Sequence, residues 1–118
     1  MDLSIEMTMS QWHHIDGDMD NEVSLAARDG RDDTVEWGRA VREAGWKQVG
    51  GWNPDVPGSG TWPPEHEWVS VTLSRQQWRF VVHVLDTWAD IDSPAAHWEL
   101  AASRLRAIIV AALGDESP

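Results

Sequence analysis

Two short segments of the chain alternate apolar and polar residues, which is the pattern of a half-buried β-strand. They are residues 3–8, Leu-Ser-Ile-Glu-Met-Thr, and residues 69–74, Val-Ser-Val-Thr-Leu-Ser. The two segments match in pattern at an offset of 66 residues. Without a gap, the same offset pairs Gln11 with Gln77, Trp12 with Trp78, Ile15 with Val81, Met19 with Leu85 and Asp20 with Asp86. We therefore predict two copies of one structural unit; the alternative is two strand-to-helix junctions that share only a generic pattern.

The second unit is predicted to continue from its strand into two helices. Ser74 can be the N-cap of the first helix, because its hydroxyl can accept a hydrogen bond from a free amide of the first turn. This helix is apolar on nearly all sides as far as Asp92, so we expect it to be central. Ser93 and Pro94 open the next helix, where proline at the first position loses no hydrogen bond, and Gly114 supplies a left-handed C-cap.

The first unit is predicted to have the same order of elements. A helix over residues 9–27 carries an apolar stripe that consists of Trp12, Ile15, Met19 and Val23. Gly17 costs this helix about 1 kcal/mol relative to alanine. A turn at Asp29 and Gly30 leads into a second helix over residues 33–49. Its apolar face is expected to consist of Trp37, Ala40, Val41 and Ala44.

Together these elements predict an α+β fold with a single domain over residues 1–118. Residues 1–49 form the first strand–helix–helix unit, residues 50–66 a loop, and residues 67–114 the second unit. About four helices would pack on a small two-stranded sheet, which a pseudo-twofold axis would make antiparallel. The edges of such a sheet are open to pairing with another chain, so a homodimer joined through a strand edge is one expectation.

The loop at residues 50–66 contains four prolines and four glycines, which excludes a helix or a central strand. Loops of this length are uncommon unless they are functional or disordered. This loop also contains Trp52 and Trp62, and tryptophan is frequent among the anchors of protein interfaces. The two side chains are therefore expected at an interface with a partner, packed on the protein's own core, or in a ligand pocket.

The charge of the chain is strongly negative, because twenty acidic and nine basic residues give a formal net charge of −11 at pH 7. Such a field repels nucleic-acid phosphates and anionic membranes, which argues against direct binding to either. It suits a basic partner, such as a protein whose groove normally holds nucleic acid. The alternative is that acidity only keeps the protein soluble.

The negative charge is concentrated in residues 1–33, where nine acidic and two basic residues give a net charge of −7. We expect the acidic residues of this part to form a face that contacts a basic partner, with Trp52 and Trp62 as anchors. The acidic residues of the expected face are Asp16, Asp18, Asp20, Glu22, Asp29, Asp32 and Asp33.

Asp16, Asp18 and Asp20 also have the 1-3-5 spacing of a calcium loop, but two other positions of that loop are wrong. Asn21 stands where the loop needs glycine, and Ala27 where it needs a bidentate glutamate. On a helix, Asp18 would also point away from the other two aspartates. A pair of His14 with Asp18 would supply only two ligands. We expect no bound metal and no other cofactor.

No pattern in the chain indicates catalysis. The absence of cysteine excludes thiol nucleophiles, thiolate metal sites and disulfides, and neither a Gly-x-Ser-x-Gly elbow nor a phosphate-binding loop is found. His83 lies among apolar residues and is expected at the core or its boundary rather than as a base. Because no signal peptide or membrane-spanning apolar run is found, we expect a cytoplasmic protein. Because no catalytic motif is found, we expect it to bind rather than catalyse.

Residues 71–78, Val-Thr-Leu-Ser-Arg-Gln-Gln-Trp, run from the second strand into an apolar helix. This stretch resembles short uncharacterised proteins of actinobacterial phages and prophages, in which a strand ending in Thr-Leu-Thr precedes a helix that opens with Gln-Trp. The resemblance covers about twenty residues, or twice that number with the repeat. It implies no functional residues, but small acidic phage proteins often bind and block a host protein, including nucleases and defence complexes.

Three functions follow as hypotheses. The first is a phage- or mobile-element-encoded protein that docks its acidic face on the basic groove of a host or defence protein and inhibits or modulates it. The second is a structural or assembly subunit of a virion. The third is a small metal- or ligand-binding protein.

Overall fold

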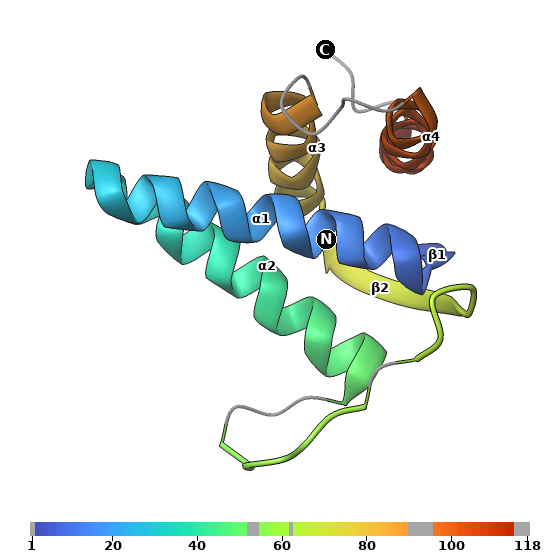
Figure 1. The fold of residues 1–118 in the computed structure, drawn as a ribbon, viewed down its shortest axis with the longest axis horizontal. Coiled ribbons are helices and arrows are strands. Elements are labelled where there is room, and N and C mark those ends of the chain that lie inside the picture. Colours follow the sequence, from blue (N-terminus) through green and yellow to red (C-terminus); the bar gives the residue numbers. More distant parts are fainter. Residues whose placement is uncertain (1, 52–54, 62, 90–95, 115–118) are drawn as a thin grey trace.

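The structure, a computed structural model, describes residues 2–51, 55–61, 63–89 and 96–114. It has the predicted α+β architecture, with four helices packed on a two-stranded antiparallel sheet. The elements in chain order are β1 (Asp2–Thr8), α1 (Met9–Asp29), α2 (Asp32–Gly50), β2 (Trp68–Ser74), α3 (Arg75–Ala89) and α4 (Ala96–Leu113). In Figure 1, α1 runs through the middle of the molecule, with α2 below it and α3 above it.

The register of the sheet shows how the two units are related. β1 and β2 pair along their whole length, and at the centre Ile5 lies opposite Val71. These two residues are also equivalent at the offset of 66. A residue lies opposite its own equivalent only at a twofold axis, so the pseudo-twofold axis of the repeat passes between Ile5 and Val71. The predicted antiparallel pairing of the two strands is confirmed.

Each strand passes into its helix through the same reciprocal cap, known as a capping box. In the first unit, the backbone N–H of Gln11 donates to the Thr8 side chain (Oγ1) at 3.2 Å, and the backbone N–H of Thr8 donates to the Gln11 side chain (Oε1) at 2.9 Å. In the second unit, Gln77 and Ser74 make the same two hydrogen bonds, at 3.1 and 2.9 Å. The predicted N-cap role of Ser74 is confirmed, and the repeat extends to the side chains that start both helices.

One hydrophobic core contains residues of both units. The residues buried at equivalent positions are Trp12 and Trp78, Ile15 and Val81, and Met19 and Leu85. The buried residues of α1 and α3 therefore lie at the same distances from the cap residue of each helix. The Trp78 indole N–H donates to the Leu3 carbonyl at 2.8 Å, which ties α3 to the strand of the other unit.

The second helices of the two units are equivalent at an offset of 64 rather than 66. Each makes an ion pair with the first helix of its own unit: Arg42 Nη1 lies 2.8 Å from Asp20 Oδ1, and Arg106 Nε lies 2.6 Å from Asp86 Oδ1. The buried residues that match at this offset are Val41 with Leu105 and Gly45 with Ile109. The segment between the aspartate and the arginine is thus two residues shorter in the second unit.

The second helices also interlock the units, because α2 packs on β2 and α4 packs on β1. Gln48 of α2 makes this contact specific. Its Nε2 donates to the Thr72 carbonyl at 2.7 Å, and the Thr72 amide donates to Gln48 Oε1 at 2.5 Å. Gln48 therefore occupies part of the outer edge of β2, the kind of edge at which a homodimer was expected.

The buried face of α2 differs from the predicted one. Trp37 and Ala40 are exposed, Trp37 to 39% of its surface. The buried residues of α2 are Gly38, Val41, Gly45 and Val49. A Cβ at Gly38 or Gly45 would clash with side chains of α1, so the glycines allow the two helices to approach closely. Because glycine has no apolar side chain, the sequence pattern did not reveal that Gly38 and Gly45 lie on the buried face of α2, and the predicted face was therefore wrong.

Two other expectations about the helices were wrong. His83 is exposed, because it lies on the side of α3 that faces away from the core. For the same reason α3 is not the central helix, a position that α1 holds (Figure 1).

Gly114 follows α4 in the left-handed region, at φ 62°, as predicted. Within the described ranges, no helix has both the length and the apolar character needed to cross a membrane.

Candidate functional site

Arg42 binds two of the aspartates that were predicted to contact a partner. It reaches from α2 to α1, where its Nε donates to Asp16 Oδ1 and its Nη1 donates to Asp20 Oδ1, both at 2.8 Å. The hydrogen bond to Asp16, followed by the charges of Asp16 and Asp20, raises the pKa of Arg42 above its ordinary value against the opposing effect of partial burial. The single positive charge of Arg42 thus offsets half of the negative charge of the two aspartates, and Asp20 keeps 58% of its side chain exposed.

Asp16 accepts a further hydrogen bond from α2. The Trp46 indole N–H donates to Asp16 Oδ1 at 2.9 Å. Trp46 also packs edge-on against Trp12, with ring centroids 6.1 Å apart. A carboxylate that binds a guanidinium and an indole at once has little capacity left for an external ligand. Asp16 therefore serves as a link between α1 and α2.

Asp18 and Glu22 lie on another side of α1, and each exposes only 4% of its surface. His14 Nε2 lies 3.4 Å from Asp18 Oδ2, and Arg31 Nη2 lies 3.8 Å from Glu22 Oε1. Neither carboxylate is accessible to a partner protein in this arrangement. Asp29, at the end of α1, is more exposed, but it lies 3.7 Å from Arg31.

The spacing of Asp16, Asp18 and Asp20 does not produce a calcium loop, because α1 continues through all three residues. Asp16 and Asp20 point toward Arg42, whereas Asp18 is buried beside His14. In the part of the chain that the structure describes, no group of three or more histidine, cysteine, aspartate or glutamate side chains could hold a metal ion.

The last two predicted acidic residues, Asp32 and Asp33, are exposed in the first turn of α2. Glu36, one turn later, is also exposed. We call these three residues the α2 acidic patch. Their charges also suit the positive end of the helix dipole. This contribution matters here because the side chain of the N-cap residue, Arg31, makes no capping hydrogen bond.

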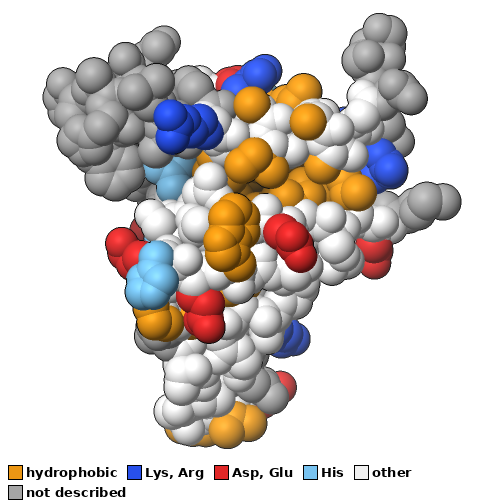
Figure 2. Space-filling view, turned by 90° about the vertical axis from the view of Figure 1, so that its right-hand side faces the viewer, with side chains coloured by type: hydrophobic (Ala, Val, Ile, Leu, Met, Phe, Trp, Pro, Cys, Tyr) orange, Lys and Arg blue, Asp and Glu red, His pale blue; other side chains and the backbone are white. Residues whose placement is uncertain are grey.

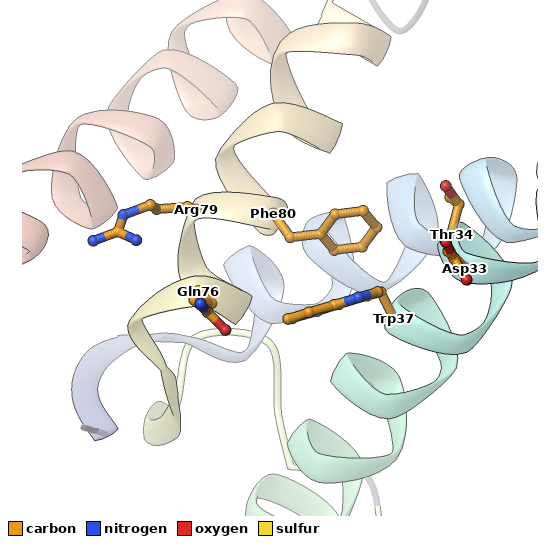
Figure 3. Close-up of a pocket in the computed structure, with 6 residues that line it drawn as sticks. All are labelled: Asp33, Thr34, Trp37, Gln76, Arg79 and Phe80. Carbon is orange, nitrogen blue, oxygen red and sulfur yellow. The ribbon is translucent and has the colours of Figure 1, made fainter.

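An open groove lies beside the α2 acidic patch, between α2 and α3, and we call it the α2–α3 groove. Its volume is about 440 Å³. It is lined by Asp33, Thr34 and Trp37 of α2 and by Gln76, Arg79 and Phe80 of α3 (Figure 3). Trp37 and Phe80 face each other, with ring centroids 6.1 Å apart and ring planes tilted by 45°. The middle of the groove is thus aromatic.

The two ends of the groove differ in charge. Of the α2 acidic patch, Asp33 lines the end of the groove formed by the start of α2. Arg79 lies on α3, and its guanidinium points away from the rings of Trp37 and Phe80 (Figure 3). A ligand that packs against the exposed surface of the rings therefore has a carboxylate at one end of the groove, and no guanidinium is directed at the rings (Figure 3).

The sequence pattern singled out neither aromatic residue of the groove, because it placed Trp37 on the apolar face of its helix and read the helix that contains Phe80 only as apolar on nearly all sides. The seven-residue spacing of Gly38 and Gly45 was the available signal, since buried glycines on one face of α2 turn Trp37 toward solvent. Trp52 and Trp62, the predicted aromatic anchors, lie outside the described residues, as do Ser93 and Pro94 at the predicted start of α4.

Trp68 is another exposed tryptophan, with 66% of its surface accessible. It begins β2, on the sheet face opposite to the buried side chains of Val71 and Leu73. Figure 2 views the molecule from the side of α4 and the sheet, where hydrophobic side chains gather and charged side chains of both signs are interspersed. Among the described residues, this side of the protein therefore carries charges of both signs instead of a continuous acidic surface (Figure 2).

The chain matches no protein-family model, and comparison with curated proteins and with solved structures finds no match.

Proposed function

We propose that the protein binds a basic partner protein and thereby inhibits or modulates it, as a phage- or mobile-element-encoded protein would act on a host or defence protein. The observation that carries the proposal is the α2 acidic patch, where Asp32, Asp33 and Glu36 are exposed next to the exposed ring of Trp37. Such a surface complements one that combines basic and apolar side chains.

The internal ion pairs determine which part of the acidic N-terminal region is available to contact a basic partner. Arg42 and Arg31 offset part of the charge of the acidic residues along α1, and burial removes Asp18 and Glu22 from the surface. A partner would therefore meet the start of α2 first. The net charge of −11 would speed the encounter over a longer range, and an aromatic contact would slow release. Carboxylates at this place would compete with phosphates for a basic groove, in the manner of a nucleic-acid mimic.

The test begins with purification of the tagged protein from a host lysate and identification of the proteins that co-elute. The dissociation constant of each purified complex is then measured over a range of salt concentrations. We expect affinity to fall steeply as salt rises, because the attraction between exposed charges is screened. Affinity that does not depend on salt would exclude the acidic surface as the cause of binding.

A matched pair of variants tests where the charge acts. The triple variant Asp32→Asn, Asp33→Asn and Glu36→Gln should weaken binding and flatten its salt dependence. The control carries Glu6→Gln, Glu43→Gln and Glu67→Gln, which remove the same charge from three exposed positions elsewhere. Equal losses in both variants would mean that only the net charge matters, and not the α2 acidic patch.

A second candidate function is that of a structural or assembly subunit of a virion. The exposed Trp68 at the start of β2 favours it, because a large aromatic on an open sheet face suits contact between subunits. Light scattering on the protein alone tests this candidate. Association that Trp68→Ala abolishes would support it, and a monomer at all concentrations would contradict self-assembly through this face.

A further inference from the structure

We infer that the α2–α3 groove is the docking site for an arginine side chain of the basic partner. This inference rests on the proposed function and adds the place and the chemistry of the contact. Two features of the groove identify the occupant, its paired aromatic rings and the carboxylate at one end, and its volume accommodates one long side chain.

The aromatic rings suit a flat cation. Trp37 exposes 39% of its surface, and its ring faces Phe80 at a centroid distance of 6.1 Å and a tilt of 45°. A guanidinium is planar and weakly hydrated, so it stacks on aromatic faces more readily than a lysine ammonium does. The apolar stem of an arginine can also lie along an aromatic wall while its charged end stays near water.

The acidic end of the groove supplies the matching charge. Asp33 lines the groove, and Asp32 and Glu36 lie within about one turn of it on α2. A carboxylate can accept two parallel hydrogen bonds from a guanidinium, a geometry that lysine cannot offer. The one cation of the lining, Arg79, points away from the rings, so it does not occupy this position (Figure 3).

The size of the groove admits an arginine side chain, and its charge disfavours other occupants. The volume of about 440 Å³ is within the range of roughly 300–1,000 Å³ found for small-molecule pockets, so one long side chain fits. An anionic ligand would meet repulsion from Asp33. A purely apolar side chain would cover Asp33 without giving its carboxylate a partner, which is costly.

The test uses the full chain, labelled with ¹⁵N, and short peptides of equal length made only of arginine, only of lysine or only of glutamate. The indole resonance of Trp37 is assigned from the Trp37→Phe variant. We expect the arginine peptide to shift this resonance and to bind more tightly than the lysine peptide. The glutamate peptide should cause no shift.

The variants separate stacking from general attraction. Trp37→Ala and Phe80→Ala should each weaken arginine-peptide binding by about fivefold to tenfold, as expected for the loss of a cation–π contact. Asp33→Asn should weaken it as well. Trp68→Ala, which removes an exposed tryptophan outside the groove, is the control and should leave the affinity unchanged. Thermal melting of each variant shows whether the fold is intact.

The outcomes distinguish the groove from the proposed function. If both basic peptides bind in a salt-dependent way but neither Trp37→Ala nor Phe80→Ala weakens binding, the groove is not the docking site, while the proposed function stands. If no basic peptide binds even at low salt, the acidic surface does not attract such partners, and both proposals are overturned. Equal binding of the arginine and lysine peptides would overturn the specific assignment of arginine.

Discussion

The indole of Trp12 lies against the backbone of Gly45, so close that a Cβ at this position of α2 would clash with the ring. Gly38, two turns earlier on the same face of α2, receives Val23 of α1 in the same way. The distance between the two helices is thus set by two missing side chains. The position of Trp37 in the α2–α3 groove depends on this packing, because Trp37 is carried by α2.

Gly45→Ala is expected to destabilise the fold by about 1–3 kcal/mol, the usual cost of overpacking, although alanine is the better helix former. Gly17→Ala is the matched control, since Gly17 is exposed on α1 and a Cβ there would meet nothing within 4 Å. This second change should stabilise the protein by up to about 1 kcal/mol. Urea denaturation of both variants measures the difference, and the same sign for both would contradict the close packing at Gly45.

Arg42→Gln is expected to cost about 1–3 kcal/mol, because it removes the charged partner of Asp16 and Asp20 where α1 and α2 meet. Arg39→Gln, at an exposed position of the same helix, is the control and should change stability by less than about 0.5 kcal/mol. Chemical denaturation at neutral pH gives both values. Similar small effects would show that the Arg42 ion pairs add nothing to the fold.

The raised pKa of Arg42 determines in which direction its contribution to the stability of the fold changes with pH. A base whose folded-state pKa is raised stabilises the fold at every pH below its unfolded value and loses this effect only as pH rises through the folded value. The ordinary pKa of arginine already lies far above the mildly alkaline range, so the stabilisation is lost only at still higher pH. The difference between Arg42→Gln and the unchanged protein should therefore be equal at neutral and mildly alkaline pH. A difference that shrinks over this range would require another titrating group.

A fragment of residues 1–50 is expected to remain unfolded by itself. In the whole protein α2 packs on β2, and β1 is covered by α4, so the first unit lacks partners for both surfaces. Circular dichroism should show little cooperative melting for this fragment or for residues 64–118 alone. Mixing the two should restore a cooperative transition. A fragment that melts cooperatively by itself would show that the units do not depend on each other.

The fold was predictable because its main signals are local. The alternation of residues 3–8 and 69–74 set the strands, and the residues that cap α1 and α3 follow each strand directly. The offset of 66 gave the pairing of the strands as well, since two equivalent strands about a twofold axis must run antiparallel. The face of α2 was not predictable in this way, because it depends on where glycine meets Trp12 in space.

The candidate site could not be predicted because its properties depend on contacts between distant residues. Arg42 lies 26 residues from Asp16 and 22 from Asp20 in the chain, and a count of charges does not reveal that it pairs with both. Trp37 and Phe80 belong to different units, and only the packing of α2 and α3 brings them together. The sequence did indicate the acidic character of Asp32 and Asp33, which the structure leaves exposed.

Gln48 is expected to protect the protein against self-association. Its amide binds both backbone groups of Thr72 on the outer edge of β2, and a free strand edge is a template for pairing with another chain. Gln48→Ala should therefore raise the dimer fraction in sedimentation velocity and lower stability by about 1 kcal/mol. Lys47→Ala, next to it and also exposed, is the control and should do neither. If Gln48→Ala leaves association unchanged, an edge-paired homodimer through Thr72 is excluded, because removing the amide frees the backbone groups that such a dimer needs.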